Sequence, residues 1–128
     1  MDKQVQIVKS YAEHDEALVD PAQFKQVFLN ILLNSLDAMD GQGGTLSVET
    51  TMQDQRLTVT IQDTGCGISK EHLARIFDPF FTTKHHGTGL GLPIVHTIIT
   101  EHRGTITFDS QMQHGTSCTL TFPLNGQP

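Results

Sequence analysis

The sequence predicts a single α+β domain in which helices cover one face of a mixed, mainly antiparallel sheet, as a two-layer sandwich. Two segments, at 21–39 and 90–102, carry apolar residues at helical spacing, and several short segments alternate between apolar and polar residues as strands do. Glycine-containing turns separate these segments. The chain has 128 residues, which is enough for one core, so we expect residues 1–128 to form one domain.

The first part of the chain is expected to contain two short strands and a long helix. The strands are predicted at 4–8 and 16–19. Asp20-Pro21 indicates the start of the helix, because Asp caps a helix N-terminus and Pro is tolerated at the first helical position. The helix is expected to end near Met39, before the DGQGG run at 40–44.

The rest of the chain is expected to supply the other strands. A hairpin turn is predicted at 53–55, between strands whose shared faces carry Leu46, Val48, Thr50 and Met52, and Leu57, Val59 and Ile61. Residues 63–89 are predicted to form a long loop with one short helix near 70–74, and a loop of that length is usually functional. After the helix at 90–102, strands are predicted at 104–109 and 116–122, joined by a turn at His114-Gly115.

Composition and charge indicate which kinds of ligand, membrane contact and cellular setting are expected. The formal net charge is −6 and there is no basic stripe, so nucleic acid is not an expected ligand. No run approaches the ~20 apolar residues that span a bilayer, so this domain is expected to make no membrane contact, although a longer parent protein can carry a membrane anchor. Cys66 and Cys118 lack CxxC spacing, Cys118 alternates with core residues, and a reducing, cytoplasmic setting is expected.

Polar side chains form a stripe along the helix at 21–39. They occupy an arc of roughly 80° on a helical wheel. One interpretation is the solvent face of an amphipathic helix, and the wheel alone favours it. Asn and Asp are poor residues inside a helix, however, so the stripe also suits a ligand or Mg²⁺. Its members are Gln23, Gln26, Asn30, Asn34 and Asp37.

An acidic residue interrupts the apolar strand that follows. Asp63 continues the series Leu57, Val59 and Ile61, so its carboxylate is expected to point toward the core at the end of the strand. A buried carboxylate needs a hydrogen-bond donor, and the exocyclic amine of adenine is a suitable one. The alternative is an Asp that caps its own turn, since DTGCG at 63–67 is rich in turn residues.

A second glycine motif opens the last helix. GTGLGL at 87–92 runs directly into it, and the free N–H groups of a helix N-terminus favour phosphate. The motif is neither a P-loop nor a dinucleotide-binding fingerprint. Between the two glycine motifs lie three phenylalanines, in IFDPFFTTK at 76–84, which are expected either to pack beneath the loop or to dock on a partner.

Together these motifs resemble the catalytic ATP-binding domain of two-component sensor histidine kinases, in the GHKL or Bergerat ATPase superfamily. Residues 24–39 resemble the N box, 63–68 the G1 box, 77–84 the F box and 87–92 the G2 box. Gly115-Thr116 resembles a late Gly-Thr turn of the same family. Each box is weak alone, but four in this order and spacing are a strong signal.

The resemblance extends from about 20 to 124 and is greatest to kinases of the nitrogen-regulator type, because Lys84 lies only three residues before Gly87. It implies a Bergerat fold with an ATP lid. Phe80 and Phe81 are then expected to anchor that lid or to face partner helices.

The resemblance also implies a role for each motif. Asn34 is expected to bind a Mg²⁺ ion that bridges the ATP phosphates, and Asn30 to contact phosphate or metal-bound water; these two are the expected catalytic residues. Asp63 is expected to accept a hydrogen bond from the adenine amine. The implied ATP-binding set is Asn30, Asn34, Asp37, Asp63, Gly65, Gly67, Ile68, Lys84, Thr88, Gly89, Leu90, Gly91, Leu92 and Thr116.

The implied reaction is transfer of the ATP γ-phosphoryl group to a histidine of a separate dimerisation and phosphoacceptor domain, and then to an Asp of a response regulator. The chain lacks the acceptor motif: HDEALV at 14–19 does not fit it, and no other histidine does. We therefore expect a catalytic half, with ATP and Mg²⁺ as cofactors, that does not phosphorylate itself in the usual way.

Three alternatives remain open. One is a related protein-serine kinase that acts as an anti-sigma factor, although the FDPFFTTK loop favours a histidine kinase. Another is a nucleotide-sensing module without catalytic activity. The third is an ATPase of the gyrase or chaperone type, which is disfavoured because those relatives carry Glu where Asn30 stands, and Asn cannot act as a general base.

Overall fold

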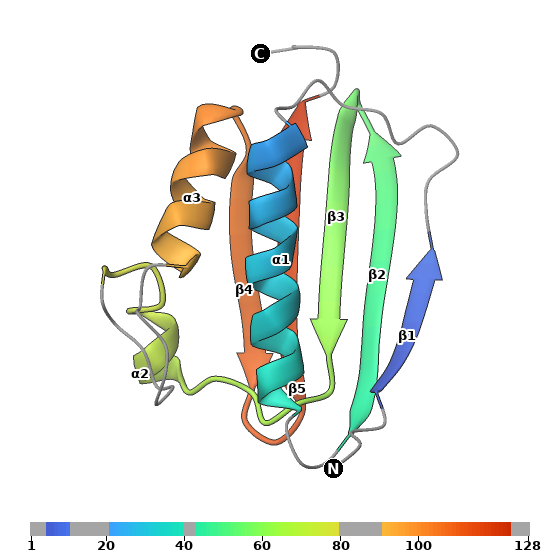
Figure 1. Cartoon of the computed structure of the whole chain (residues 1–128), viewed down its shortest axis with the longest axis vertical. Coiled ribbons are helices and arrows are strands. Elements are labelled where there is room, and N and C mark those ends of the chain that lie inside the picture. The colour runs from blue at the N-terminus through green and yellow to red at the C-terminus, as the bar shows by residue number, and fades with distance from the viewer. Residues whose placement is uncertain (1–4, 11–20, 40–42, 80–90, 124–128) are drawn as a thin grey trace.

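The computed structural model describes residues 5–10, 21–39, 43–79 and 91–123, with residues 5–10 and Pro21 described by their backbone alone. These residues form two layers, a five-stranded sheet and helices on one of its faces (Figure 1). The predicted α+β class is confirmed. The strand predicted at 16–19 and the helix cap predicted at Asp20 lie outside the described residues.

The sheet is mixed and mainly antiparallel, as predicted. Its strands are β1 (Val5–Ser10), β2 (Gly44–Gln53), β3 (Arg56–Asp63), β4 (Thr105–Gln111) and β5 (Gly115–Pro123). They lie in the order β1-β2-β3-β5-β4, so β5, the last strand in the sequence, is inserted between β3 and β4. Only β1 and β2 pair in parallel among the strands that the structure describes.

The hairpin between β2 and β3 is one residue tighter than predicted. Gln53 pairs with Arg56, so it belongs to β2, and only Asp54 and Gln55 form the turn. Both turn residues have positive φ, 55° and 61°, as a type I′ turn requires. This turn type matches the right-handed twist of the strands that it joins.

In the described part of the chain three helices accompany the sheet: α1 (Pro21–Ala38), the short α2 (Lys70–Leu73) and α3 (Gly91–Glu101). All three match predicted helices within one or two residues. The end of α3 is a Schellman motif, in which Gly104 N–H donates to Ile99 C=O at 2.9 Å and Arg103 N–H donates to Thr100 C=O at 3.0 Å. Arg103 adopts the left-handed conformation that this motif needs, with φ 62°.

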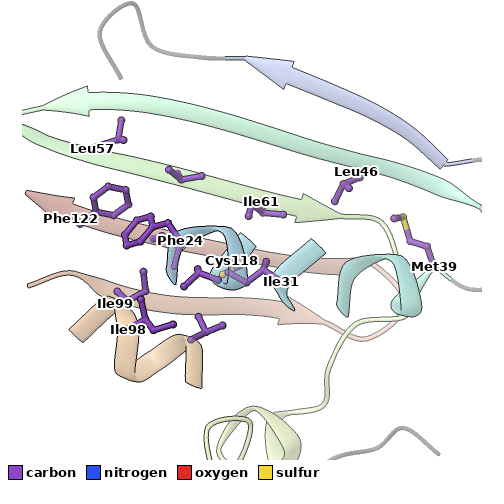
Figure 2. Close-up of a cluster of buried hydrophobic side chains, with 14 residues drawn as sticks. Phe24, Ile31, Met39, Leu46, Leu57, Ile61, Ile98, Ile99, Cys118 and Phe122 are labelled. Atoms are coloured by element: carbon purple, nitrogen blue, oxygen red, sulfur yellow. The ribbon is translucent and has the colours of Figure 1, made fainter. Parts of the chain in front are cut away.

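The core lies between the helices and the sheet. α1 packs against β3 and β5 and α3 packs against β4, so the two helices lie side by side (Figure 1). Figure 2 shows Phe24 of α1 beside Phe122 of β5, with ring centroids 5.0 Å apart in an edge-to-face arrangement. The most deeply buried side chains are Ile31, Met39, Ile61, Ile99, Leu120, Val27 and Val95.

Strand register arranges the inward side chains of β3 and β5 in rows. Leu57 pairs with Phe122, Val59 with Leu120 and Ile61 with Cys118, and all six are buried. Directly opposed residues of an antiparallel pair place their side chains on the same face. The next row along the sheet continues the series with Asp63 and Thr116, so the apolar rows end in a polar one.

The many apolar residues of α1 suggest a largely buried helix, but only part of its surface is buried. Phe24, Val27 and Ile31 face the sheet, but Leu29 and Leu33 are 54% and 48% exposed. They lie about one-third of a turn or more away from the buried arc, on a side of the helix that neither the sheet nor α3 covers. α1 is therefore less buried than its apolar sequence suggests.

The two cysteines should differ strongly in reactivity. Cys118 is buried, and burial raises the pKa of its thiol to about 12, whereas Cys66 is exposed. At pH 8 only on the order of one Cys118 thiol in ten thousand is ionised, and the thiolate is the reactive form. A thiol-reactive reagent should modify Cys66 rapidly in the native protein and Cys118 only after unfolding. Mass spectrometry after each treatment provides the measurement; rapid native labelling of Cys118 would contradict its place in the core.

Candidate nucleotide-binding site

Three polar side chains form a row across neighbouring strands at one end of the sheet. Asp63 of β3 is paired with Thr116 of β5, and Thr116 is paired with Ser110 of β4. Asp63 is only 3% exposed and Thr116 9%. The predicted inward orientation of the Asp63 carboxylate is therefore confirmed, and the pairing adds two hydroxyl groups beside it.

The alternative interpretation of Asp63, as the cap of its own turn, is also correct for one of its oxygens. Gly65 N–H donates to Asp63 Oδ1 at 2.9 Å, a buried hydrogen bond across two residues. A backbone donor of this kind offsets part of the cost of burying a carboxylate. The two interpretations are compatible. Asp63 caps its turn through Oδ1, and the same inward carboxylate has a second acceptor, Oδ2.

The segment after β3, residues 64–68, is fastened to the C-terminal end of α1. Cys66 N–H donates to Ala38 C=O at 3.0 Å, which satisfies a carbonyl that the end of a helix leaves without a helical partner. Gly65 lies directly against the same carbonyl, and a Cβ at this position would be 2.6 Å from the Ala38 oxygen. Glycine at 65 is thus required for this close approach.

The same segment is fastened on its other side to the turn between β4 and β5. Gln113 N–H donates to Cys66 C=O at 2.8 Å, and Ile68 N–H donates to Ser110 Oγ at 2.7 Å. Gly67 has φ 80°, and a Cβ there would overlap the Gln111 carbonyl. Segment 64–68 therefore bridges α1 and the β4–β5 turn, with Asp63 held at its root.

The two asparagines of the helical stripe lie on the border between buried and exposed surface. Asn30 and Asn34 are both half-buried, one turn apart on α1, whereas Asp37 is exposed near the end of the helix. The Asn30 amide lies against the first residue of α3, since a Cβ on Gly91 would be 3.4 Å from Asn30 Oδ1. The structure thus brings one predicted asparagine to the start of the predicted phosphate-binding helix.

α3 begins at this point. Gly91 and Leu92 are half-buried in its first turn, where Pro93 is tolerated because first-turn N–H groups have no helical acceptor. The other predicted residues of this glycine motif and of the lid, namely Lys84, Thr88, Gly89 and Leu90, lie outside the described residues, as do Phe80 and Phe81.

Phe77 packs beneath the loop, which is one of the two outcomes predicted for the phenylalanine cluster. Its ring centroid lies 5.8 Å from that of Phe108 on β4 and 4.9 Å from the His96 ring on α3. Its neighbour Ile76 is buried. These contacts anchor the segment that follows α2. The N-terminus of α2 is capped by Ser69, whose Oγ accepts a hydrogen bond from His72 N–H at 3.2 Å.

Ser110 belongs to this site although it was not among the predicted residues. The signal was present, because Ile106, Phe108 and Ser110 alternate on β4 as Val59, Ile61 and Asp63 do on β3. In both strands the inward series changes from apolar to polar at the end that reaches segment 64–68.

The site offers oxygen and nitrogen groups of the kind that hold a nucleotide, and few groups that hold a metal ion alone. Over residues 21–39, 43–79 and 91–123, no cluster of three or more His, Cys, Asp or Glu could hold a metal. Magnesium often binds through one or two protein oxygens together with substrate phosphates, so an amide oxygen such as that of Asn34 fits a metal that arrives with a nucleotide. No helix in the described part of the chain has the length and apolar character needed to cross a bilayer.

Residues 19–126 match the family model described as histidine kinase-, DNA gyrase B- and HSP90-like ATPase. The sensor histidine kinase ZraS of Escherichia coli (strain K12) is 43% identical over 110 residues, which are 86% of this chain and 23% of that protein. Sporulation kinase A of Bacillus subtilis (strain 168) is 42% identical over 104 residues, 81% of this chain and 17% of that protein. The chain therefore spans only about a fifth of the length of these curated relatives.

The fold is also that of a solved structure, the catalytic domain of histidine kinase ThkA in a nucleotide-free form. It superposes with a TM-score of 0.82 at 30% identity, covering 94% of this chain and 79% of that one. The similarity thus includes the arrangement of sheet and helices as well as the sequence motifs.

Proposed function

The chain belongs to the histidine kinase-, DNA gyrase B- and HSP90-like ATPase family and corresponds to the catalytic ATPase domain of its sensor histidine kinases, and on this premise we propose how it acts. It binds ATP with Mg²⁺ between α1, segment 64–68 and the start of α3. It then transfers the γ-phosphoryl group to a histidine of a dimerisation domain, from which a response regulator receives it. This proposal rests on two contacts of α1. Asn30 lies against Gly91 of α3, and Ala38, at the C-terminal end of α1, accepts a hydrogen bond from Cys66 in the segment that follows Asp63.

The proposed site is elongated along one flank of α1. Its Asn30 end meets α3 at Gly91, and its Ala38 end meets segment 64–68. Eight residues of helix separate these ends, which corresponds to roughly 12 Å. An elongated ligand with a base at one end and phosphates at the other suits these two separate ends, with Asn34 one turn from Asn30 between them.

We assign adenine to the Asp63 end. The carboxylate is buried, Gly65 N–H occupies its Oδ1, and Oδ2 is the oxygen that we assign to the exocyclic amine. In this assignment Gly65, Gly67, Ile68 and Thr116 complete the adenine end of the site. A carboxylate only accepts hydrogen bonds when ionised, so it favours an amine donor over the carbonyl that guanine carries at the equivalent ring position.

We assign the phosphates to the Asn30 end, where the N-terminus of α3 supplies backbone N–H groups and the positive end of a helix dipole. Asn34 is the proposed magnesium ligand, with Asn30 at a phosphate or metal-bound water. When bound, the ion neutralises charge on the phosphate oxygens. Asp37, Lys84, Thr88, Gly89, Leu90 and Leu92 complete the proposed set.

Catalysis in this proposal is mainly positioning and charge stabilisation. Asn30 has no carboxylate with which to activate water, which favours transfer to a protein acceptor over hydrolysis. The domain acts with a phosphoacceptor domain of the same kinase, in a cytoplasmic setting. A protein-serine kinase of the anti-sigma type and a non-catalytic nucleotide sensor are the competing functions that the experiments below separate.

Asp63→Asn tests the adenine assignment without removing the turn. The amide keeps an oxygen for the Gly65 N–H bond but places an NH₂ group where Oδ2 was. Loss of a charge-assisted hydrogen bond costs roughly 1.5–3 kcal/mol, so the Kd for ATP should rise about ten- to hundredfold. Calorimetric titration with ATP and GTP measures the effect. Asp109→Asn, on the exposed face of β4, is the matched control and should bind ATP normally. Equal affinity of the wild type for ATP and GTP would refute the adenine assignment.

Asn34→Ala tests the metal role by the dependence of ATP binding on Mg²⁺. Wild-type protein should bind ATP more tightly with Mg²⁺ than with a chelator present, because the ion links protein oxygen to phosphate. The variant should bind equally weakly under both conditions, and its affinity should match that of the wild type in chelator. Gln26→Ala, two turns earlier on α1 and exposed, should retain the metal dependence. A variant that keeps the full magnesium effect counts against the assignment.

Phosphoryl transfer is tested with γ-labelled ATP and a separately produced acceptor domain of the same kinase. Label should pass to a histidine of that domain, and phosphohistidine is recognised by its loss in acid and survival in alkali. An acceptor domain whose histidine is replaced by Gln is the control and should stay unlabelled. Acid-stable label on serine would support the anti-sigma alternative, and binding of ATP without any transfer would support the nucleotide sensor.

A further inference from the structure

Ser110 joins three groups at the adenine end of the proposed site. Its Oγ lies 2.7 Å from Ile68 N, 3.0 Å from Gly115 O and 2.8 Å from Thr116 Oγ1. The first contact fastens segment 64–68, and the second fastens the turn that opens β5. The third reaches the side chain that is paired with Asp63 across the strands.

The number of hydrogens that each group carries limits the direction of these hydrogen bonds. Ile68 N–H can only donate, and the Gly115 carbonyl can only accept. Ser110 has one hydroxyl hydrogen, and its bond to Gly115 C=O uses it. With the Ser110 hydrogen assigned to Gly115 C=O, Thr116 is the donor in the remaining contact, and its single hydrogen points to Ser110.

A Thr116 hydroxyl held in this way has only lone pairs left for a ligand. It stands beside the Asp63 carboxylate, which also only accepts hydrogen bonds when ionised. The end of the site therefore presents two neighbouring acceptors. Such a pair matches a ligand edge, or a bridging water, that donates, and it opposes a carbonyl oxygen.

We propose that Ser110 is a positioning residue that holds the Thr116 hydroxyl as an acceptor and thereby sharpens selection of adenine over guanine. This inference rests on the proposed nucleotide site. Ser110 itself touches no reacting atom. Without the Ser110 oxygen, the Thr116 hydrogen is free to rotate toward the ligand, and the site gains a donor that can hydrogen-bond to the guanine carbonyl oxygen.

The test is the ratio of ATP to GTP affinity, measured by calorimetry on the whole 128-residue chain with Mg²⁺ present. Ser110→Ala should lower this ratio about two- to tenfold, the range that one hydrogen bond of ~0.5–1.5 kcal/mol produces. Ser110→Thr keeps the hydroxyl and should restore the ratio toward the wild-type value. Ser117→Ala, on the opposite face of β5, is the matched control and should leave it unchanged.

A double-mutant cycle separates positioning from a general loosening of the loop. Thr116→Val should lower the ratio as Ser110→Ala does, and adding Ser110→Ala to Thr116→Val should not lower it further. A Ser110→Ala variant that loses ATP and GTP affinity by the same factor, or lowers the ratio equally in the Thr116→Val background, overturns the proposal. If Ser110→Ala fails to fold, as judged by circular dichroism, a wild-type ratio in Thr116→Val overturns it instead. Wild-type protein that binds neither nucleotide refutes the nucleotide site itself, an outcome distinct from the loss of selectivity.

Discussion

The register between β3 and β5 is the constraint on which the rest of the site depends. It stacks buried apolar pairs in successive rows and then sets Asp63 opposite Thr116 in the next one. A shift of one residue in the pairing of β3 with β5 would turn every one of these side chains to the other face of the sheet. The apolar core that stabilises the sheet therefore also fixes the Asp63 carboxylate on the inner face. A buried carboxylate is costly without donors, and the Gly65 N–H bond supplies only one. The polar row is thus held in place by apolar packing and is completed, in the proposed function, by a ligand.

One side of α1 packs in the core, and another side carries residues of the proposed site. Val27 and Ile31 are buried against the sheet, while Asn30 and Asn34 are half-buried, with Asn30 against the start of α3. Because both helices pack on the same face of one sheet, their relative position is set by the core, and the Asn30–Gly91 approach follows from it. The C-terminal carbonyl of Ala38 then extends the arrangement to segment 64–68. One rigid helix therefore spaces the two ends of the elongated site.

Much of this could be predicted from local pattern, and what could not depends on distant pairing. Alternation along β3 predicted that Asp63 points inward, and burial confirms it. The contribution of Ser110 was not predicted, because its importance arises only when the β4–β5 hairpin pairs with the distant β3 and places Ser110, Thr116 and Asp63 in one row. The reason for glycine at 67 is of the same kind, since its neighbour is the Gln111 carbonyl, far along the chain. The helical wheel identified the polar stripe but missed the exposure of Leu29 and Leu33, because a wheel does not show where the neighbouring layers end.

Segment 64–68 links these parts mechanically. It is bonded to α1 through Ala38, to the β4–β5 turn through Gln113 and to Ser110 through Ile68 N–H, so a displacement of any one of these neighbours moves the root of the Asp63 turn. Backbone hydrogen bonds on both sides hold segment 64–68, the proposed adenine end, in a preformed conformation, and preformed groups lose less entropy on binding than mobile ones. The proposed phosphate end is built differently, from side-chain amides and a helix start. In the proposed reaction this division suits transfer: the base is held by a rigid end of the site, and at the other end an asparagine binds without activating water, so the γ-phosphoryl group is kept for a protein acceptor.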